Sequence, residues 1–237
     1  MTRKPNFKFN WKYALGEIVL IFIGISLAIG FQNWNESRKD GIKINGYLAT
    51  IADNLSSDSL EIVRFIETSK RKEKDGKKYL SAVKQKQPDF QAFMGGMVQL
   101  EEEYLNINNN GFEGLKASGY LSNIQSSPIE DALFNYYSYF DEIHELELSY
   151  NQFVEAQELE FVKNVASAEF MIMVTDIYLN KRTPNLNAQE QKKLEQIFNH
   201  PSIVSISLRA GFLERHYDEL LQKGNKLKRL IKERAKQ

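Results

Sequence analysis

The chain has 237 residues with 31 basic and 31 acidic side chains, so its formal net charge is zero. That balance argues against a nucleic-acid-binding protein, which normally carries a basic excess. There is no cysteine, which excludes disulfides, thiolate metal sites and cysteine nucleophiles. With 42% hydrophobic and 26% charged residues, the composition is that of a folded protein, long enough for one domain plus an appended segment.

An uncharged apolar run, IVLIFIGISLAIGF, occupies residues 18–31. It is short for a membrane span, which needs about 20 residues, but extension to residues 13–35 supplies the missing length. Trp11 and Trp34 stand near the two ends, where aromatic side chains typically mark the membrane interfaces. The sequence therefore predicts a transmembrane helix over residues 13–35 that contacts the lipid bilayer.

The charges around this span predict its orientation. The basic residues before it and the mixed charges after it are Arg3, Lys4, Lys8 and Lys12, then Glu36, Arg38, Lys39, Asp40 and Lys43. The positive-inside rule favours a cytoplasmic N-terminus. We therefore predict a single-pass protein of the bacterial inner membrane, with a basic cytoplasmic segment over residues 1–12 and a periplasmic domain over residues 36–237.

A cleaved signal peptide is the alternative interpretation of the same segment. A basic start, an apolar core and the small-x-small sequence Ala28-Ile29-Gly30 all fit it. Glu17 near the start of the core and Trp34 just past it favour a retained anchor. Cleavage after Gly30 removes the anchor, so the mass of the mature protein distinguishes the two interpretations.

Polar and small residues share one face of the predicted span. At about 100° per residue, five of them fall on or beside one narrow face, namely Glu17, Gly24, Ala28, Asn35 and, beside these, Gln32. Small residues permit the close approach of a second helix, and polar residues can hydrogen-bond across the interface. The sequence therefore predicts a partner-facing stripe within the membrane.

Glu17 is the most unusual residue of the span, because an ionisable group inside a membrane is costly and often functional. Three roles are open. Glu17 packs against a partner helix, or it snorkels to the interface and pairs with Lys12 or Tyr13, or it transfers protons. The packing role is preferred.

The stretch GEIVLIFIGISLAIGFQNWNESRK, residues 16–39, resembles the opening of an uncharacterised family of small single-pass bacterial membrane proteins, a domain of unknown function. Residues 111–137, GFEGLKASGYLSNIQSSPIEDALFNYY, resemble a second segment of that family. The resemblance implies an N-terminal anchor and a helical extracytoplasmic domain, and it implies no activity or ligand. The matching anchor residues are Gly16, Glu17, Ile18, Ile23, Gly24, Ile25, Ala28, Asn33, Trp34, Asn35 and Glu36.

Beyond the span, apolar residues recur at spacings of three and four over residues 44–84, which predicts an amphipathic helix. No proline separates it from the span, so the helix is expected to continue out of the membrane. A second helix is predicted over residues 89–105, interrupted by two glycines. Turn-rich residues 106–111 follow, and then a short helix over residues 112–120.

Ser127-Pro128-Ile129-Glu130 is the clearest helix start, with a capping serine, a proline at the first position and a glutamate that completes a capping box. We predict helices from there to about residue 179, over residues 187–198, and from Pro201 through four heptads of apolar residues. No strand is predicted. The chain is therefore expected to be all-α, with an N-terminal transmembrane helix followed by an antiparallel bundle of about four to six helices.

Charge is segregated along the predicted bundle. Thirteen acids lie between residues 100 and 160 against Lys116 alone, whereas seven bases lie in residues 223–236 against Glu233 alone. The preferred explanation is that acidic and basic helix faces lie beside one another. The alternative is that the basic tail meets anionic headgroups or a partner.

Asp141-x-x-His144, with Glu145 and Glu147 nearby, matches only part of a carboxylate-bridged metal site, which needs two Glu-x-x-His motifs and two further glutamates. A surface histidine among acids is the preferred interpretation. Phosphate-loop, dinucleotide and nucleophile-elbow motifs are absent. The sequence thus predicts no catalytic residue, no metal ligand and no cofactor.

These features favour a non-enzymatic, membrane-anchored helical module that binds a protein partner or forms a homo-oligomer in the cell envelope, without nucleic acid. Two alternatives stay open. One is a periplasmic sensory bundle that binds a ligand and signals through a partner. The other is a single-span subunit of an ion-driven membrane complex in which Glu17 titrates.

Overall fold

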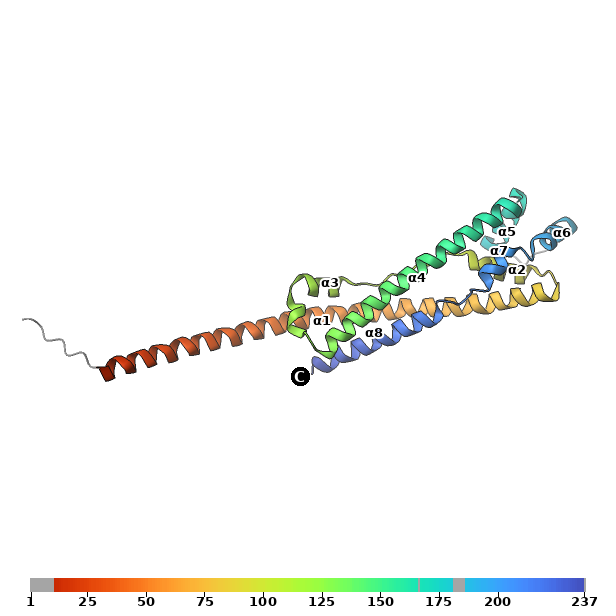
Figure 1. Cartoon of the computed structure of the whole chain (residues 1–237). Helices are drawn as coiled ribbons and strands as arrows, with labels where there is room; N and C mark the ends of the chain where they lie inside the picture. The colour runs from red at the N-terminus through yellow and green to blue at the C-terminus, as the bar shows by residue number, and fades with distance from the viewer. Residues whose placement is uncertain (1–10, 166, 181–185, 237) are drawn as a thin grey trace, which may run out of the picture.

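The structure, a computed structural model, describes residues 11–165, 167–180 and 186–236. These residues form eight α-helices and two short 3-10 helices, with no strand among them (Figure 1). The prediction of an all-α chain with an N-terminal apolar helix and a helix bundle is confirmed. The first ten residues of the predicted basic segment lie outside the described residues.

Helix α1 (Trp11–Gln85) is 75 residues long and begins far outside the bundle (Figure 1). At 1.5 Å per residue it extends over roughly 110 Å. No proline occurs within it, so nothing removes a donor from its backbone hydrogen bonds. Among the described side chains the first buried one is Ile44. The continuity predicted between the apolar segment and the amphipathic helix is confirmed.

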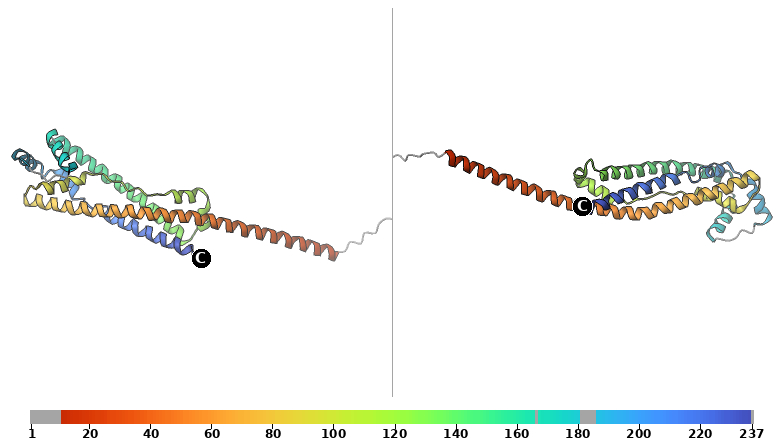
Figure 2. Two further views of the ribbon diagram at one scale, coloured as in Figure 1. Left: turned by 180° about the vertical axis from the view of Figure 1, so that it is seen from behind. Right: turned by 90° about the horizontal axis from the view of Figure 1, so that it is seen from below.

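Three long helices make the bundle, namely the part of α1 after Ile44, α4 (Pro128–Val165) and α8 (Glu214–Arg234) (Figures 1 and 2). Helix α8 runs antiparallel to the other two. We call the end of the bundle nearest the apolar segment the near end, and the end at Gln85 the far end. Apolar stripes of the three helices meet in one core, which includes Ile44, Leu48, Ile51, Leu55, Leu133, Tyr136, Ile143, Leu220, Leu227 and Ile231.

Between α1 and α4 the chain returns toward the near end in an extended form. Helix α2 (Phe90–Met97) and the 3-10 helix η1 (Val98–Leu100) are followed by residues 101–109, which have no helical structure and are here called the strap. The strap leads to α3 (Asn110–Ala117) at the near end. The helix predicted over residues 89–105 is therefore wrong in its second half.

The alternation of buried side chains explains the extended form of the strap. Leu105 and Ile107 are buried, whereas Tyr104 and Asn106 are exposed. A period of two places alternate side chains on one side of an extended chain, whereas a helix would separate them by about 200°. Only the extended form buries both apolar side chains of the strap.

At the far end, α5 (Ala168–Asn180), α6 (Ala188–Ile197) and α7 (Pro201–Ser207) pack with α2 and the last turns of α1. A second core forms there, and it includes Tyr79, Phe90, Phe93, Phe161, Phe170, Leu194, Phe198 and Ile203. The predicted helix over residues 187–198 is confirmed in α6, whose capping box joins Asn187 and Glu190.

Two predicted long helices are divided. The helix expected to reach residue 179 ends at Val165, and a separate helix, α5, starts at Ala168, where Ser167 Oγ accepts the backbone N–H of Phe170. The helix expected from Pro201 is broken by a turn over residues 208–213. Gly211 has a φ of 78° there, a left-handed conformation that glycine adopts without strain. The short helix predicted over residues 112–120 is instead α3 followed by η2 (Tyr120–Ile124).

Candidate functional site

The apolar part of α1 lies outside the protein core. Among the described residues, one helix is long and apolar enough to cross a membrane, and it is α1, near the N-terminus. An 18-residue window of it has a mean hydropathy of 2.0, and none of that window is buried by the rest of the chain. Large side chains such as Leu20 and Phe22 are 74% and 70% exposed. An apolar surface of this kind favours a lipid environment.

The spacing of the two tryptophans fits the thickness of a bilayer. Trp11 and Trp34 are 70% and 61% exposed, and their separation of 23 residues corresponds to roughly 35 Å along the helix. A hydrocarbon core is about 30 Å thick, with polar layers outside it. This separation fits the prediction that the two tryptophans mark opposite membrane interfaces.

The stripe predicted from the sequence lies on this exposed segment. Glu17, Gly24, Ala28 and Gln32 are exposed and Asn35 is partly exposed. A Cβ atom built on Gly24 would meet no atom within 4 Å, so the fold of this chain does not require a glycine there. Gln32 Nε2 donates to Glu36 Oε1 at 3.0 Å. The small and polar residues of the stripe are therefore available for contacts outside the described chain.

A second site lies inside the bundle, where side chains of α1 and α4 bind the backbone of the strap. We call it the polar seam. Its four contacts are Lys72 Nζ to Glu101 O at 2.7 Å, Asn151 Nδ2 to Glu103 O at 3.0 Å, Leu105 N to Glu147 Oε1 at 3.1 Å and Asn108 N to Asp58 Oδ1 at 3.0 Å. An extended chain without a neighbouring strand has unpaired backbone groups, and burying them unpaired is costly. The seam supplies the missing partners.

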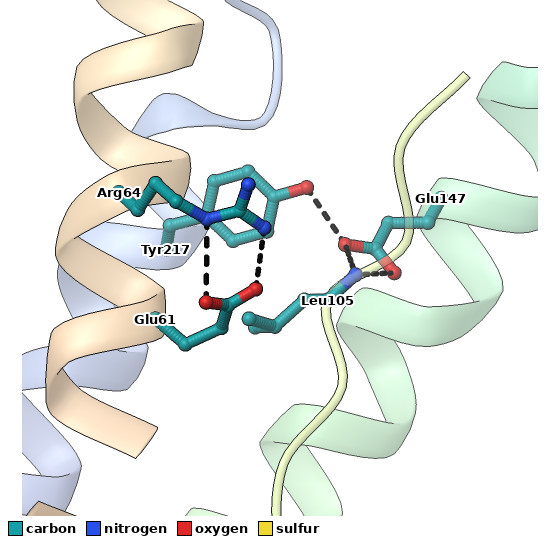
Figure 3. Close-up of polar contacts among 5 residues, drawn as sticks. All are labelled: Glu61, Arg64, Leu105, Glu147 and Tyr217. Carbon is teal, nitrogen blue, oxygen red and sulfur yellow. Dashed lines mark hydrogen bonds and ion pairs between the residues drawn. The ribbon is translucent and has the colours of Figure 1, made fainter. Parts of the chain in front are cut away.

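Glu147 is the centre of the seam (Figure 3). Its side chain is completely buried. It accepts the backbone N–H of Leu105 and the hydroxyl of Tyr217, the latter at 2.7 Å, and so joins α4, the strap and α8. Burial raises the pKa of Glu147, and the hydrogen bonds from Tyr217 and Leu105 oppose that shift. Burial and the nearby Glu147 raise the pKa of the Tyr217 hydroxyl.

Asp58 occupies the corresponding position toward the near end. It is 4% exposed, and burial raises its pKa while the hydrogen bond from Asn108 N–H opposes the shift. Figure 3 also shows the ion pair of Glu61 and Arg64 on α1. That pair lies largely in solvent and contributes little to stability. The buried carboxylates, rather than the surface ion pair, hold the strap.

A small cavity adjoins the seam and limits what it can bind. The cavity measures about 30 Å³ and is lined by residues that include Lys72, Glu103, Tyr150 and Tyr217. That volume accommodates one or two water molecules, whereas small-molecule sites measure about 300–1,000 Å³. The part of the seam around Lys72 and Tyr217 therefore fixes the strap and has no room for a metabolite.

Few features of the amino-acid sequence pointed to the seam. Glu147 stood out only as one of the acids near His144, whose side chain is 47% exposed and lies 3.9 Å from Glu147. The informative signals were the position of Glu147 on the apolar stripe of α4, four residues after buried Ile143, and the alternation of Leu105 and Ile107. In the part of the chain that the structure describes, no three histidine, aspartate or glutamate side chains gather as a metal site.

The chain was compared with family models, curated proteins and solved structures. No family model, no curated protein and no solved structure matches it. The resemblance of residues 16–39 and 111–137 to an uncharacterised membrane-protein family therefore stays a prediction.

Proposed function

We propose that this protein is a non-enzymatic, membrane-anchored helical module that associates with a protein partner or with a second copy of itself in the cell envelope. The observation that carries the proposal is that α1 has two parts in different surroundings. Its first part is an apolar helix with nothing of the chain around it, and its second part is the spine of the bundle. Because the helix is unbroken, a contact made in the membrane is rigidly connected to the domain.

The topology belongs to the same proposal. Residues 13–35 cross the bacterial inner membrane, the N-terminus is cytoplasmic and the bundle is periplasmic. The positive-inside rule supports this orientation through the basic residues of segment 1–12. The chain has no cysteine, so single cysteines at Ser37 and Thr2 provide clean probes. We expect a membrane-impermeant maleimide to label Ser37→Cys in intact spheroplasts, and to label Thr2→Cys only after the membrane is opened. The reverse pattern contradicts the topology.

The stripe on α1 is the surface we propose for association within the membrane. Its small residues allow a second helix to approach, and Glu17, Gln32 and Asn35 can hydrogen-bond across the contact. Disulfide trapping of a single-cysteine reporter at Leu27 tests this in native membranes. We expect Gly24→Leu to reduce trapping severalfold.

Gly30→Leu is the matched control, because Gly30 lies about 120° around the helix from Gly24, and a Cβ on either glycine meets nothing within 4 Å. Equal trapping in the wild type and the Gly24→Leu variant would exclude the stripe as the contact. Equal loss in both variants would indicate a general effect on insertion.

The ion-driven alternative depends on Glu17, whose side chain is exposed on the apolar segment. In that proposal Glu17 takes up and releases protons within a larger complex.

The sensory alternative depends on a ligand bound to the bundle. The polar hollow of about 670 Å³ beside Asp58 and residues 106–110 is the candidate site for that ligand. Native mass spectrometry of the purified full chain tests for such a ligand, and a stoichiometric metabolite would favour the sensor over the association module.

A further inference from the structure

Basic side chains gather in one half of α8. Residues 214–222 hold three acids and one base, whereas residues 223–236 hold seven bases and only Glu233 as an acid. The helix is therefore strongly polarised along its axis. The bases of the second half are Lys223, Lys226, Lys228, Arg229, Lys232, Arg234 and Lys236.

The fold carries this basic half to the near end of the bundle. Helix α8 runs back along α1, and its last turn reaches Asn45, whose Oδ1 accepts from Arg234 Nε at 3.4 Å. Figures 1 and 2 show the C-terminus beside the point where α1 leaves the bundle. Two further bases lie close to this end, Lys43, which donates to Tyr120 OH, and Lys116 of α3.

The near end lies close to the membrane that α1 is proposed to cross. Eleven residues separate Trp34 from Asn45, about 16 Å along the helix. The headgroup layer occupies about 5–7 Å of that length. The remainder, about 10 Å, is close to the Debye length of about 8 Å at physiological ionic strength. The bases of the near end are thus within electrostatic reach of the lipid surface.

Part of this charge is not used within the fold. Lys223 pairs with Glu219, Arg229 approaches Glu233, and Arg234 binds Asn45. In contrast, Lys226, Lys232 and Lys236 are exposed. Lys232 is in the last turn of α8 and Lys236 lies just beyond its end, whereas Lys226 lies about two turns farther from the membrane. The three supply positive charge where an anionic membrane supplies the opposite sign.

We infer that the near end is a second membrane contact, in which the basic half of α8 docks on anionic lipid headgroups of the leaflet that the bundle faces. The inference rests on the proposed anchoring by α1. Membrane helices commonly tilt by about 20°, so α1 can lean toward the side of α8 and bring its lysines to the headgroups. Docking would fix the tilt of α1 in the membrane. Because α1 is continuous to Gln85, docking would also fix the position of the far end relative to the membrane.

The test uses the full chain reconstituted into vesicles. A fluorophore on Ala235→Cys, an exposed position, reports proximity to a lipid that carries a quencher on its headgroup. We expect stronger quenching in vesicles of phosphatidylcholine with phosphatidylglycerol than in phosphatidylcholine alone, and loss of the difference at high salt. A label on Gln189→Cys at the far end should show no such difference.

A charge-matched pair of variants identifies the residues. Replacing Lys226, Lys232 and Lys236 with glutamine should lower the ratio of docked to undocked molecules by about fivefold in anionic vesicles. Replacing Arg71, Lys74 and Lys84 with glutamine removes the same charge from an exposed surface of α1 far from the membrane, and should change nothing.

Each other outcome is decisive. Equal quenching of the label on Ala235→Cys in both lipids, with the protein still floating with the vesicles, overturns the docking and leaves the anchor intact. Failure to float overturns the anchor itself. Equal losses in both triple variants show a general charge effect and reject the assignment to α8.

Discussion

The two parts of α1 differ in how their apolar residues are arranged. Over residues 15–35 large apolar side chains occur on every side of the helix except the narrow stripe of Glu17, Gly24, Ala28 and Asn35, and they are exposed. Over residues 44–66 they follow one stripe, which is buried against α4 and α8. A helix that is apolar on every side needs an apolar surrounding, whereas a striped helix needs only a partner on one side. One unbroken helix therefore combines a segment suited to an apolar surrounding with a segment suited to packing in water.

The largest expected effect comes from replacing leucine with alanine in the buried part of α1, and the same replacement in the exposed part is the comparison. Leu55 is 1% exposed and Leu20 is 74% exposed. We expect Leu55→Ala to lower the free energy of unfolding of the bundle by about 3 kcal/mol, because it leaves a cavity in the core. Leu20→Ala should change that free energy by less than about 0.5 kcal/mol. Urea unfolding of the detergent-solubilised full chain, followed by circular dichroism, measures both. Comparable losses would mean that residues 15–35 also pack within the fold.

The next effect concerns the seam that holds the strap. Glu147→Gln replaces one of the two acceptor oxygens beside Leu105 N–H with an NH2 group that cannot accept, so a buried donor of the strap or of Tyr217 is left poorly paired, and we expect a loss of about 2 kcal/mol. Glu145→Gln, at an exposed position on the same helix, is the control and should be nearly neutral. Amide hydrogen exchange at Leu105 should quicken in the first variant alone. Unchanged exchange at Leu105 would show that Glu147 does not hold the strap.

The two buried carboxylates also predict how stability depends on pH. Burial raises the pKa of Glu147 above 4.5 and that of Asp58 above 3.8, their ordinary values. The folded state therefore binds protons more tightly than the unfolded state, and the free energy of unfolding falls as pH rises from the ordinary pKa through the raised one. Above the raised pKa the carboxylates are ionised in both states, and the destabilisation from burying their charge is complete. Below the ordinary pKa they are protonated in both states, and this destabilisation is absent.

Urea titrations between about pH 4 and pH 8 measure this slope. We expect the difference in stability between the wild type and the double variant Glu147→Gln, Asp58→Asn to change with pH in that direction. A difference that stays constant, or a wild-type stability that rises relative to the variant with pH, would contradict the raised pKa values.

The smallest expected effect on the fold comes from Glu17→Gln. Glu17 lies on the exposed apolar segment, far from the bundle, so the free energy of unfolding of the bundle should not change measurably. Under the association proposal, the variant should still insert and should still trap dimers or partners through the Leu27 reporter, because glutamine keeps the hydrogen-bonding capacity. Complete loss of a cellular phenotype with insertion and trapping intact would favour the ion-driven alternative.

Much of the fold followed from the sequence because local signals were strong. The absence of proline between the predicted span and Pro88 predicted the unbroken α1, and the pair Asn187 and Glu190 predicted the cap of α6. Tertiary requirements overrode the sequence pattern elsewhere. The apolar spacing continues through residues 201–217 although the helix breaks at Gly211, because the turn buries Leu213 in the same core as Tyr217.

The alternation of Leu105 and Ile107 hinted at the extended strap, but the hydrogen bonds of the seam could not be predicted from the sequence. Residues 101–109 bind through their backbone, and backbone groups leave no trace in side-chain patterns. Their partners Asp58 and Glu147 lie far away in the sequence and look like ordinary helix acids. The residues of the stripe on α1 were identified from the sequence. The structure adds that no other part of the described chain contacts the position of Gly24.

The retained anchor is the central claim, and the intact mass of the protein in alkali-washed native membranes tests it most directly. We expect the mass of the whole chain, 27.5 kDa, in the membrane pellet, because residues 13–35 remain and span the bilayer. A shorter mass that lacks the first thirty residues, found in the soluble fraction, would show a cleaved signal peptide and contradict the account.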